Sequence, residues 1–194
     1  MNRLIFSLKI GLVYLVVIAL FFGNEIYAKY QEHTVSEQNQ EQLAVISQEA
    51  KEDSSYVPAP PVKIEIERLD IELNVLDGEY DSSNSTWTLS NDSAHYALQT
   101  QLPNFDQGNT LIYGHNLENI FGNLKDLING DILILTDQSG KKIAYTFKGF
   151  EVLKPNDTSI FYYQGQAQLS LLTCYGLFDS ERLVSKFQPV NLVE

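Results

Sequence analysis

Short apolar runs with a period of two recur through residues 60–194 of this chain. In the first run, 62–69, the apolar side chains of Val62, Ile64 and Ile66 alternate with charged ones, as expected for a strand with one buried face. Seven further runs fit strands, at 71–75, 86–89, 110–113, 131–136, 143–152, 169–173 and 183–187. Residues 137–140, Asp-Gln-Ser-Gly, predict a hairpin between two of these runs. The pattern predicts a mostly β domain, either a barrel or a sandwich.

Helical patterns are few and short. One lies near residues 91–98. The other spans 117–127, where Ile120, Leu124 and Leu127 share a face at spacings of four and three. We therefore expect two short helices beside the strands.

The composition excludes several classes of protein. Hydrophobic residues make up 44% and charged residues 20%, which is ordinary for a folded domain. The net charge is −12 and the longest basic cluster is a pair of lysines, so we expect no nucleic-acid partner. The chain contains a single cysteine, Cys174, so an intramolecular disulfide is impossible.

The N-terminal part of the chain predicts a membrane tether. Residues 1–28 carry Arg3 and Lys9 ahead of an uncharged apolar run at 10–24, which fits a single transmembrane segment with an inside N-terminus. A signal peptide cleaved after Ala28 is the alternative. Residues 29–57 form a polar, acidic stalk, and the folded domain covers 58–194. Both alternatives place this domain outside the cytoplasm, and the transmembrane reading places it at the cell membrane.

Cys174 ends the apolar run at 169–173 and has two interpretations. It could be a small buried hydrophobic residue, as lone cysteines in apolar strands often are. It could also be a nucleophile, because an unpaired thiol outside the cytoplasm is a liability unless it is buried or used. Neighbouring residues are needed to separate the two.

Arg182 follows Cys174 after a loop containing Gly176, Asp179 and Ser180. A hairpin there would place Cys174 and Arg182 opposite each other, where a guanidinium could lower the thiol pKa or hold an oxyanion. A surface ion pair between Arg182 and Asp179 or Glu181 is the alternative.

Three histidines remain. His33 lies in the stalk, and we expect His95 to be structural. His115 follows Gly114 at the end of the strand run at 110–113, so its imidazole can point off the strand end. Together His115, Cys174 and Arg182 supply an acid or base, a nucleophile and a charge stabiliser, the set that acyl transfer through a thioester requires. No cluster has the ligand spacing of a zinc or calcium site, so we expect neither a metal nor a cofactor.

The segments Thr-Leu-Ile-Tyr-Gly-His-Asn (110–116) and Leu-Leu-Thr-Cys-Tyr (171–175), followed by Arg182, resemble the sortases, which are surface-anchoring cysteine transpeptidases. Trp87, the segment 103–110 and the segment 121–131 resemble the same family around its histidine. The resemblance implies an eight-stranded β-barrel with short helices behind an N-terminal transmembrane helix. It also implies that Cys174 attacks the Thr–Gly carbonyl of an LPXTG-like sorting signal, while His115 exchanges protons with the amines and Arg182 binds the substrate backbone or the oxyanion.

The implied partners are a sorting-signal protein and an amine of the cell wall or of a pilin. The stalk lacks the Asp-Pro-aromatic lid of pilin-polymerising class C members, which favours a class D/E-like sortase. Two other readings stay open. One is a different extracytoplasmic cysteine peptidase or transpeptidase; the L,D-transpeptidases place a His and a Gly just before the cysteine, and residues 170–173 contain neither. The other is a non-catalytic, membrane-tethered barrel that binds peptides.

Overall fold

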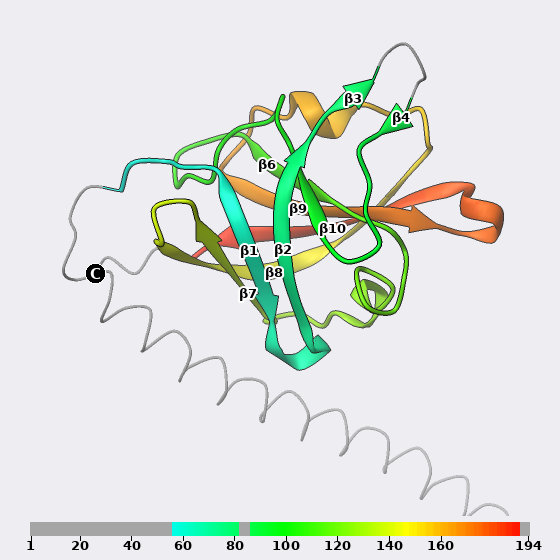
Figure 1. Ribbon diagram of the computed structural model, residues 1–194, viewed down its shortest axis with the longest axis horizontal. Helices are drawn as coiled ribbons and strands as arrows, with labels where there is room; N and C mark the ends of the chain where they lie inside the picture. Colours follow the sequence, from blue (N-terminus) through cyan, green and yellow to red (C-terminus); the bar gives the residue numbers. More distant parts are fainter. Residues whose placement is uncertain (1–55, 82–85, 191–194) are drawn as a thin grey trace, which may run out of the picture. The chain divides into compact units, whose positions relative to one another are not determined.

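The computed structural model describes residues 56–81 and 86–190. Eight strands close into a barrel in the order β1-β2-β5-β6-β9-β10-β8-β7 (Figure 1). Their bounds are β1 Pro61–Ile66, β2 Ile71–Gly78, β5 Ala94–Ala97, β6 Asn109–Tyr113, β7 Ile132–Asp137, β8 Lys142–Leu153, β9 Gln168–Tyr175 and β10 Glu181–Pro189. The pairs β2–β5 and β6–β9 are parallel, and the other barrel pairs are antiparallel. The predicted mostly β, eight-stranded barrel is confirmed.

The predicted membrane segment, 1–28, and the stalk up to residue 55 lie outside the described residues. Within 56–81 and 86–190, no helix is both long enough and apolar enough to span a membrane. The helices described there are short 3₁₀ turns: η1 Glu67–Leu69, η2 Leu124–Asp126, η3 Ser159–Tyr162 and η4 Leu177–Asp179.

The core fills the barrel with aliphatic and aromatic side chains. Ile64, Leu133, Leu169 and Phe187 are completely buried there. The predicted alternation of β1 holds for Ile64 and Ile66. It fails for Val62, which is partly exposed because the register of β1 against β7 shifts between Pro61 and Lys63. A bulge of this kind moves one side chain to the other face of the strand.

The predicted hairpin at 137–140 is confirmed. It joins β7 to β8, and Gly140 closes it with a hydrogen bond from its backbone N–H to the Asp137 carbonyl (2.9 Å) at a φ of 83°. Asp137 Oδ1 also accepts hydrogen bonds from Ser139 N, Ser139 Oγ and Lys141 N. The side chain of Asp137 therefore fixes the turn.

Three local predictions are wrong. Residues 94–97, expected in a helix, form strand β5 between β2 and β6; all four side chains are buried, so they lack the alternation of a half-buried strand. The run at 86–89 provides only β4 (Thr86–Trp87), which pairs with β3 (Tyr80–Asp81) outside the barrel. Residues 117–127 form turns ending in η2 rather than a helix, because the backbone N–H groups of both Ile120 and Gly122 bond to the Leu117 carbonyl.

A buried ion pair ties the β1–β2 connection to the segment that precedes β7. Arg68 donates from Nε to Asp131 Oδ1 (2.7 Å) and from Nη2 to Asp131 Oδ2 (2.5 Å), and Asp131 is almost fully buried. Arg68 also bonds to the Asp126 carbonyl, and Ile128 N donates to the same carboxylate. Both oxygens of this buried carboxylate therefore have hydrogen-bond partners, which offsets the cost of burying a polar group.

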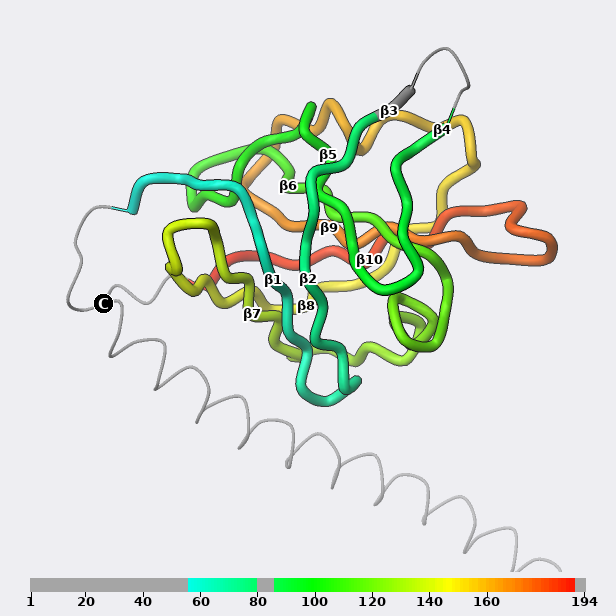
Figure 2. The backbone as a smooth tube through the Cα atoms, viewed as in Figure 1, coloured from blue at the N-terminus to red at the C-terminus, as the bar shows by residue number. Residues whose placement is uncertain are grey.

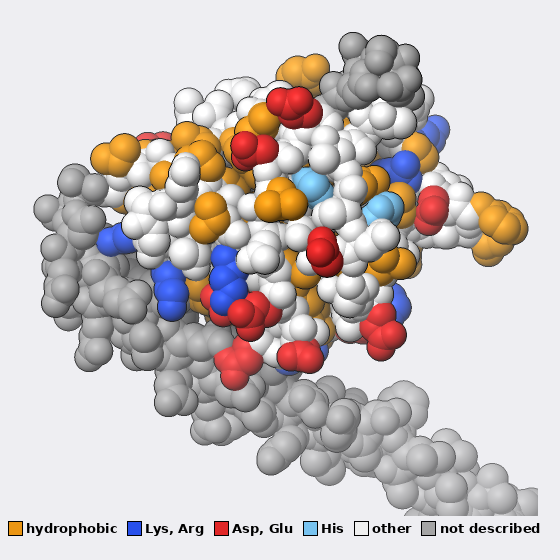
Figure 3. All heavy atoms as spheres, viewed as in Figure 1, with side chains coloured by type: hydrophobic (Ala, Val, Ile, Leu, Met, Phe, Trp, Pro, Cys, Tyr) orange, Lys and Arg blue, Asp and Glu red, His pale blue; other side chains and the backbone are white. Residues whose placement is uncertain are grey.

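A second apolar cluster lies on the outside of the barrel. Leu111, Tyr113 and Val184 point away from the core, and η3 covers them with Ile160 and Phe161. The β9–β10 hairpin extends beyond this face as the long projection in Figure 2. Apolar side chains gather at its tip in Figure 3, where Leu177 and Phe178 are 78% and 96% exposed.

Candidate active site

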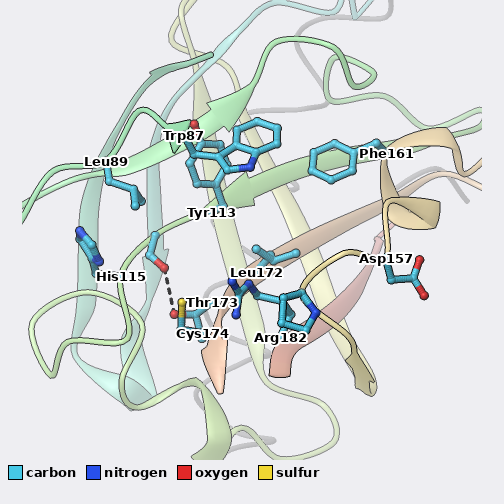
Figure 4. A pocket seen from close by; sticks show the side chains of 12 residues that line it. Trp87, Leu89, Tyr113, His115, Asp157, Phe161, Leu172, Thr173, Cys174 and Arg182 are labelled. Atoms are coloured by element: carbon cyan, nitrogen blue, oxygen red, sulfur yellow. Dashed lines mark hydrogen bonds between the residues drawn. The ribbon is translucent and has the colours of Figure 1, made fainter. Parts of the chain in front are cut away.

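The parallel pairing of β6 with β9 brings two strand ends together. Tyr113 pairs with Leu172, and the Gly114 N–H donates to the Leu172 carbonyl (3.1 Å). The Thr173 hydroxyl donates to the Gly114 carbonyl (2.9 Å), the bond drawn in Figure 4. His115 and Cys174 are the next residues on these two segments, so the site is assembled where both strands end.

The hairpin pairing of Cys174 with Arg182 is confirmed. β9 and β10 are antiparallel, and Cys174 lies directly opposite Arg182. Side chains of directly paired residues leave the same face of a sheet. The sulfur and the guanidinium therefore face the same pocket, as Figure 4 shows.

The pocket has a volume of about 150 Å³ and contains all three residues singled out from the sequence. Twelve residues line it: Trp87, Leu89, Tyr113, Gly114, His115, Pro155, Asp157, Phe161, Leu172, Thr173, Cys174 and Arg182. In the view of Figure 4, the Cys174 sulfur lies between the His115 ring and the Arg182 guanidinium. His33 lies outside the described residues, and His95 is buried and does not line the pocket.

Arg182 is held by the backbone of its own hairpin. Its Nη1 donates to the carbonyl oxygens of Asp179 (2.9 Å) and Glu181 (2.8 Å). The alternative of a surface ion pair with either carboxylate is not what the structure has, because the bonds go to main-chain oxygens. Over the described ranges, Nε and Nη2 of Arg182 have no hydrogen-bond partner, which leaves donors for a bound group.

Opposing effects act on the Cys174 thiol, which is partly buried and free. Burial raises its pKa, the positive charge of Arg182 lowers it, and the negative charge of Asp179 raises it again. The net direction is upward, so the resting sulfur is mainly a neutral thiol at pH 7. Among the described residues, no hydrogen bond joins Cys174 to His115.

The position of His115 depends on close packing around Gly114. A Cβ added to Gly114 would lie 2.9 Å from Ile120 Cγ2 and 3.1 Å from Phe121 Cδ2. Phe121 N donates to the His115 carbonyl (3.2 Å), which closes the following loop over the strand end. Glycine is therefore needed at 114 for this loop to hold the histidine backbone.

An aromatic wall, composed of Tyr113, Trp87 and Phe161, completes the pocket. Trp87 stacks on Phe161 with centroids 5.2 Å apart and meets Tyr113 edge to face at 5.1 Å. Sequence reasoning singled out Trp87 only through the family resemblance, and it missed Tyr113 and Phe161 as pocket residues. These three side chains come from β4, β6 and η3, so no local spacing relates them.

Comparison with known proteins identifies the family and the fold. A family model described as the Sortase domain matches residues 64–190. A lid mutant of sortase A from Corynebacterium diphtheriae is 26% identical, with a TM-score of 0.57 over 71% of this chain and 73% of that one. Sortase C-1 from Actinomyces oris shares the fold at 23% identity, with a TM-score of 0.55 over 66% of this chain and 73% of that one. No curated protein matches by sequence.

Proposed function

Because the chain belongs to the sortase family, we propose that it is a cysteine transpeptidase that cleaves an LPXTG-like sorting signal and transfers the acyl group to an amine. The observation that carries the proposal is the meeting of Cys174, His115 and Arg182 in one pocket. A nucleophile, an acid or base and a cation are the groups that acyl transfer through a thioester needs.

The reaction has two halves. The proton of the Cys174 thiol passes to His115, and the resulting thiolate attacks the Thr carbonyl carbon of the Thr–Gly bond. The tetrahedral intermediate collapses, His115 protonates the departing amine, and a thioester remains on Cys174. An incoming amine then attacks the thioester, gives its proton to His115, and releases the sulfur with a new amide bond formed. No oxidant or cofactor takes part.

Arg182 stabilises the charge that develops on the carbonyl oxygen. Its Nη1 is occupied by two backbone carbonyls, which fixes the direction of the guanidinium. The free Nε and Nη2 hydrogens can then point at an oxyanion or a peptide carbonyl. A preorganised donor of this kind costs no rearrangement during the reaction.

The raised thiol pKa has a kinetic consequence. The reactive form needs Cys174 as the thiolate and His115 as the imidazolium, and burial of the sulfur makes this pair a minority at neutral pH. We therefore propose a slow enzyme whose substrate supplies part of the activation by excluding water and engaging Arg182.

We further propose that residues 1–28 anchor the chain by a single membrane pass and hold the catalytic barrel at the outer face of the cell membrane. The motivation is the apolar run at 10–24 behind Arg3 and Lys9. The donor substrates are then surface proteins with sorting signals, and the acceptor is an amine of a cell-wall precursor or of a pilin. The missing Asp-Pro-aromatic motif favours a class D/E-like sortase over a pilin-polymerising one.

Intact mass of the full-length chain in detergent micelles tests the activity. The chain is mixed with LPXTG-like peptides and a panel of amines. We expect a thioester adduct on Cys174 that passes to an amine, and its loss in Cys174→Ala. Ser139→Ala, which removes a hydroxyl from the β7–β8 turn, is the matched control and should retain the adduct. A thiol that forms no adduct and resists alkylation until the protein unfolds would instead indicate a non-catalytic peptide-binding barrel.

A further inference from the structure

His95 extends the aromatic wall into the interior of the protein. Its ring stacks on Tyr113 with centroids 5.7 Å apart and planes 25° apart. The two residues are also direct partners across the β5–β6 ladder. A continuous row of rings therefore runs from His95 through Tyr113 and Trp87 to Phe161. His95 is the member of this row that does not line the pocket.

Both nitrogens of the His95 ring have partners. Nδ1 lies 3.3 Å from the Asp77 carbonyl and Nε2 lies 2.9 Å from Ser90 Oγ. A carbonyl oxygen can only accept, so Nδ1 carries the hydrogen. The single hydrogen of the Ser90 hydroxyl has two acceptors within reach, the Ser93 carbonyl at 3.3 Å and His95 Nε2 at 2.9 Å. In the neutral ring the nearer Nε2 accepts it. The imidazole thus bridges strand β2 and the segment around Ser90.

Ser90 belongs to the segment that supplies one side of the pocket. It follows Leu89 and lies three residues beyond Trp87, and both of these line the pocket. Strand β4, where this segment begins, pairs only with β3 and takes no part in the barrel ladder. The Ser90–His95 bond is therefore a side-chain tie from this outer segment to barrel strand β5.

The other end of the His95 contacts leads to the proposed catalytic histidine. Tyr113 is the last residue of β6, and Gly114 and His115 follow it directly. The Tyr113 ring fits because residue 78 is a glycine, whose added Cβ would lie only 2.8 Å from the ring atoms Cε1 and Cζ. The ring is thus confined between Gly78, His95 and Trp87.

We propose that His95 is a positioning residue for the pocket, which holds the Trp87–Leu89 side through Ser90 and the end of β6 through Tyr113. This inference rests on the proposed function and concerns how tightly the pocket grips the apolar part of a donor peptide. His95 touches neither the sulfur nor the substrate. Loss of the hydrogen bond between His95 and Ser90 lowers the affinity for the donor peptide and leaves the chemistry at Cys174 unchanged.

The test compares Ser90→Ala and His95→Asn with Ser90→Thr in the full-length chain in detergent micelles. The first two lose the Ser90–His95 bond, while threonine keeps a hydroxyl at position 90. For Ser90→Ala we expect KM for the donor peptide to rise about fivefold with kcat unchanged, since one hydrogen bond is lost. His95→Asn also removes the ring that bonds to Asp77 and stacks on Tyr113, so its KM should rise at least as much. Ser90→Thr should restore KM, and Ser139→Ala is again the control.

Fluorescence gives a second readout that does not depend on turnover. Trp87 is the one tryptophan of the chain, so acrylamide quenching reports on this wall alone. We expect acrylamide to quench Trp87 fluorescence more strongly in Ser90→Ala and His95→Asn than in the wild type. Ser90→Thr should be quenched as the wild type is. If Ser90→Ala changes neither the quenching nor KM, the inference is wrong. It is also wrong if Ser90→Ala lowers kcat and the thermal midpoint of unfolding while KM stays constant. A wild-type chain without activity would refute the proposed function, and quenching would still decide the role of His95.

Discussion

Cys174 and Arg182 lie directly opposite each other on β9 and β10, and the guanidinium is fixed by the carbonyls of its own hairpin. Because its guanidinium is held in one orientation, Arg182 acts as a hydrogen-bond donor with a fixed direction and not only as a nearby positive charge. Arg182→Lys keeps the charge but loses the planar fork. We expect kcat to fall about 100-fold, as on loss of an oxyanion donor, with the fold intact. Steady-state peptide transfer measures this, and a lysine variant with wild-type kcat would show that charge alone suffices.

The thiol pKa should respond in opposite directions to the two nearby charges. Asp179→Asn removes a charge that raises the pKa of Cys174, so the pH midpoint of iodoacetamide alkylation should move down. Asparagine tolerates the left-handed backbone at this position, where φ is 57°. Arg182→Gln removes a charge that lowers the pKa, and the midpoint should move up. Equal midpoints in both variants would mean that neither charge acts on the sulfur.

Gly114→Ala should damage both stability and activity. The new Cβ meets Ile120 and Phe121 at contact distances that require the loop after His115 to move. We expect a loss of about 1–3 kcal/mol in the free energy of unfolding, typical of overpacking. Urea denaturation measures the stability, and thioester formation measures the displacement of His115. An alanine variant as stable as the wild type would contradict the packing argument.

Asp131→Ala should destabilise the barrel without touching the pocket. It leaves the Arg68 guanidinium partly buried without its carboxylate and removes an acceptor from Ile128 N. Breaking a buried pair in this way costs about 3 kcal/mol. Denaturant unfolding gives the change, and the specific activity of the folded fraction should stay constant. A loss of less than about 1 kcal/mol in the free energy of unfolding would mean that this ion pair contributes no more than an exposed salt bridge.

Phe178→Gly should stabilise the chain. Phe178 is 96% exposed and has a φ of 55°, so its side chain gains little packing while its backbone is strained. Relief of that strain is worth about 1 kcal/mol. Leu177→Gly is the matched control, because Leu177 is also exposed but lies outside the left-handed region, and glycine there should destabilise. A lower thermal midpoint for Phe178→Gly would mean that the phenyl ring makes stabilising contacts.

Most of the barrel was predictable because half-buried strands alternate. Each of the three local failures has its own cause. Burial on both sides removes the alternation from β5, the run at 86–89 pairs with β3 outside the barrel, and the apolar spacing at 117–127 serves a set of packed turns. The site was predictable where residues are linked by a strand end or a hairpin, as His115, Cys174 and Arg182 are. Tyr113 and Phe161 were missed because they meet only after β6 and η3 are packed together.

The parallel ladder between β6 and β9 has a consequence for how the chain matures. Two parallel strands cannot be joined by a tight turn, and here β7, β8 and η3 intervene between them. Such distant pairings form late in folding, because a large loop must close first. The thiol of Cys174 therefore meets His115 only once the β6–β9 ladder has formed. Under the proposed function, a chain in which this ladder has not yet formed carries the nucleophile without its proton partner and is inactive.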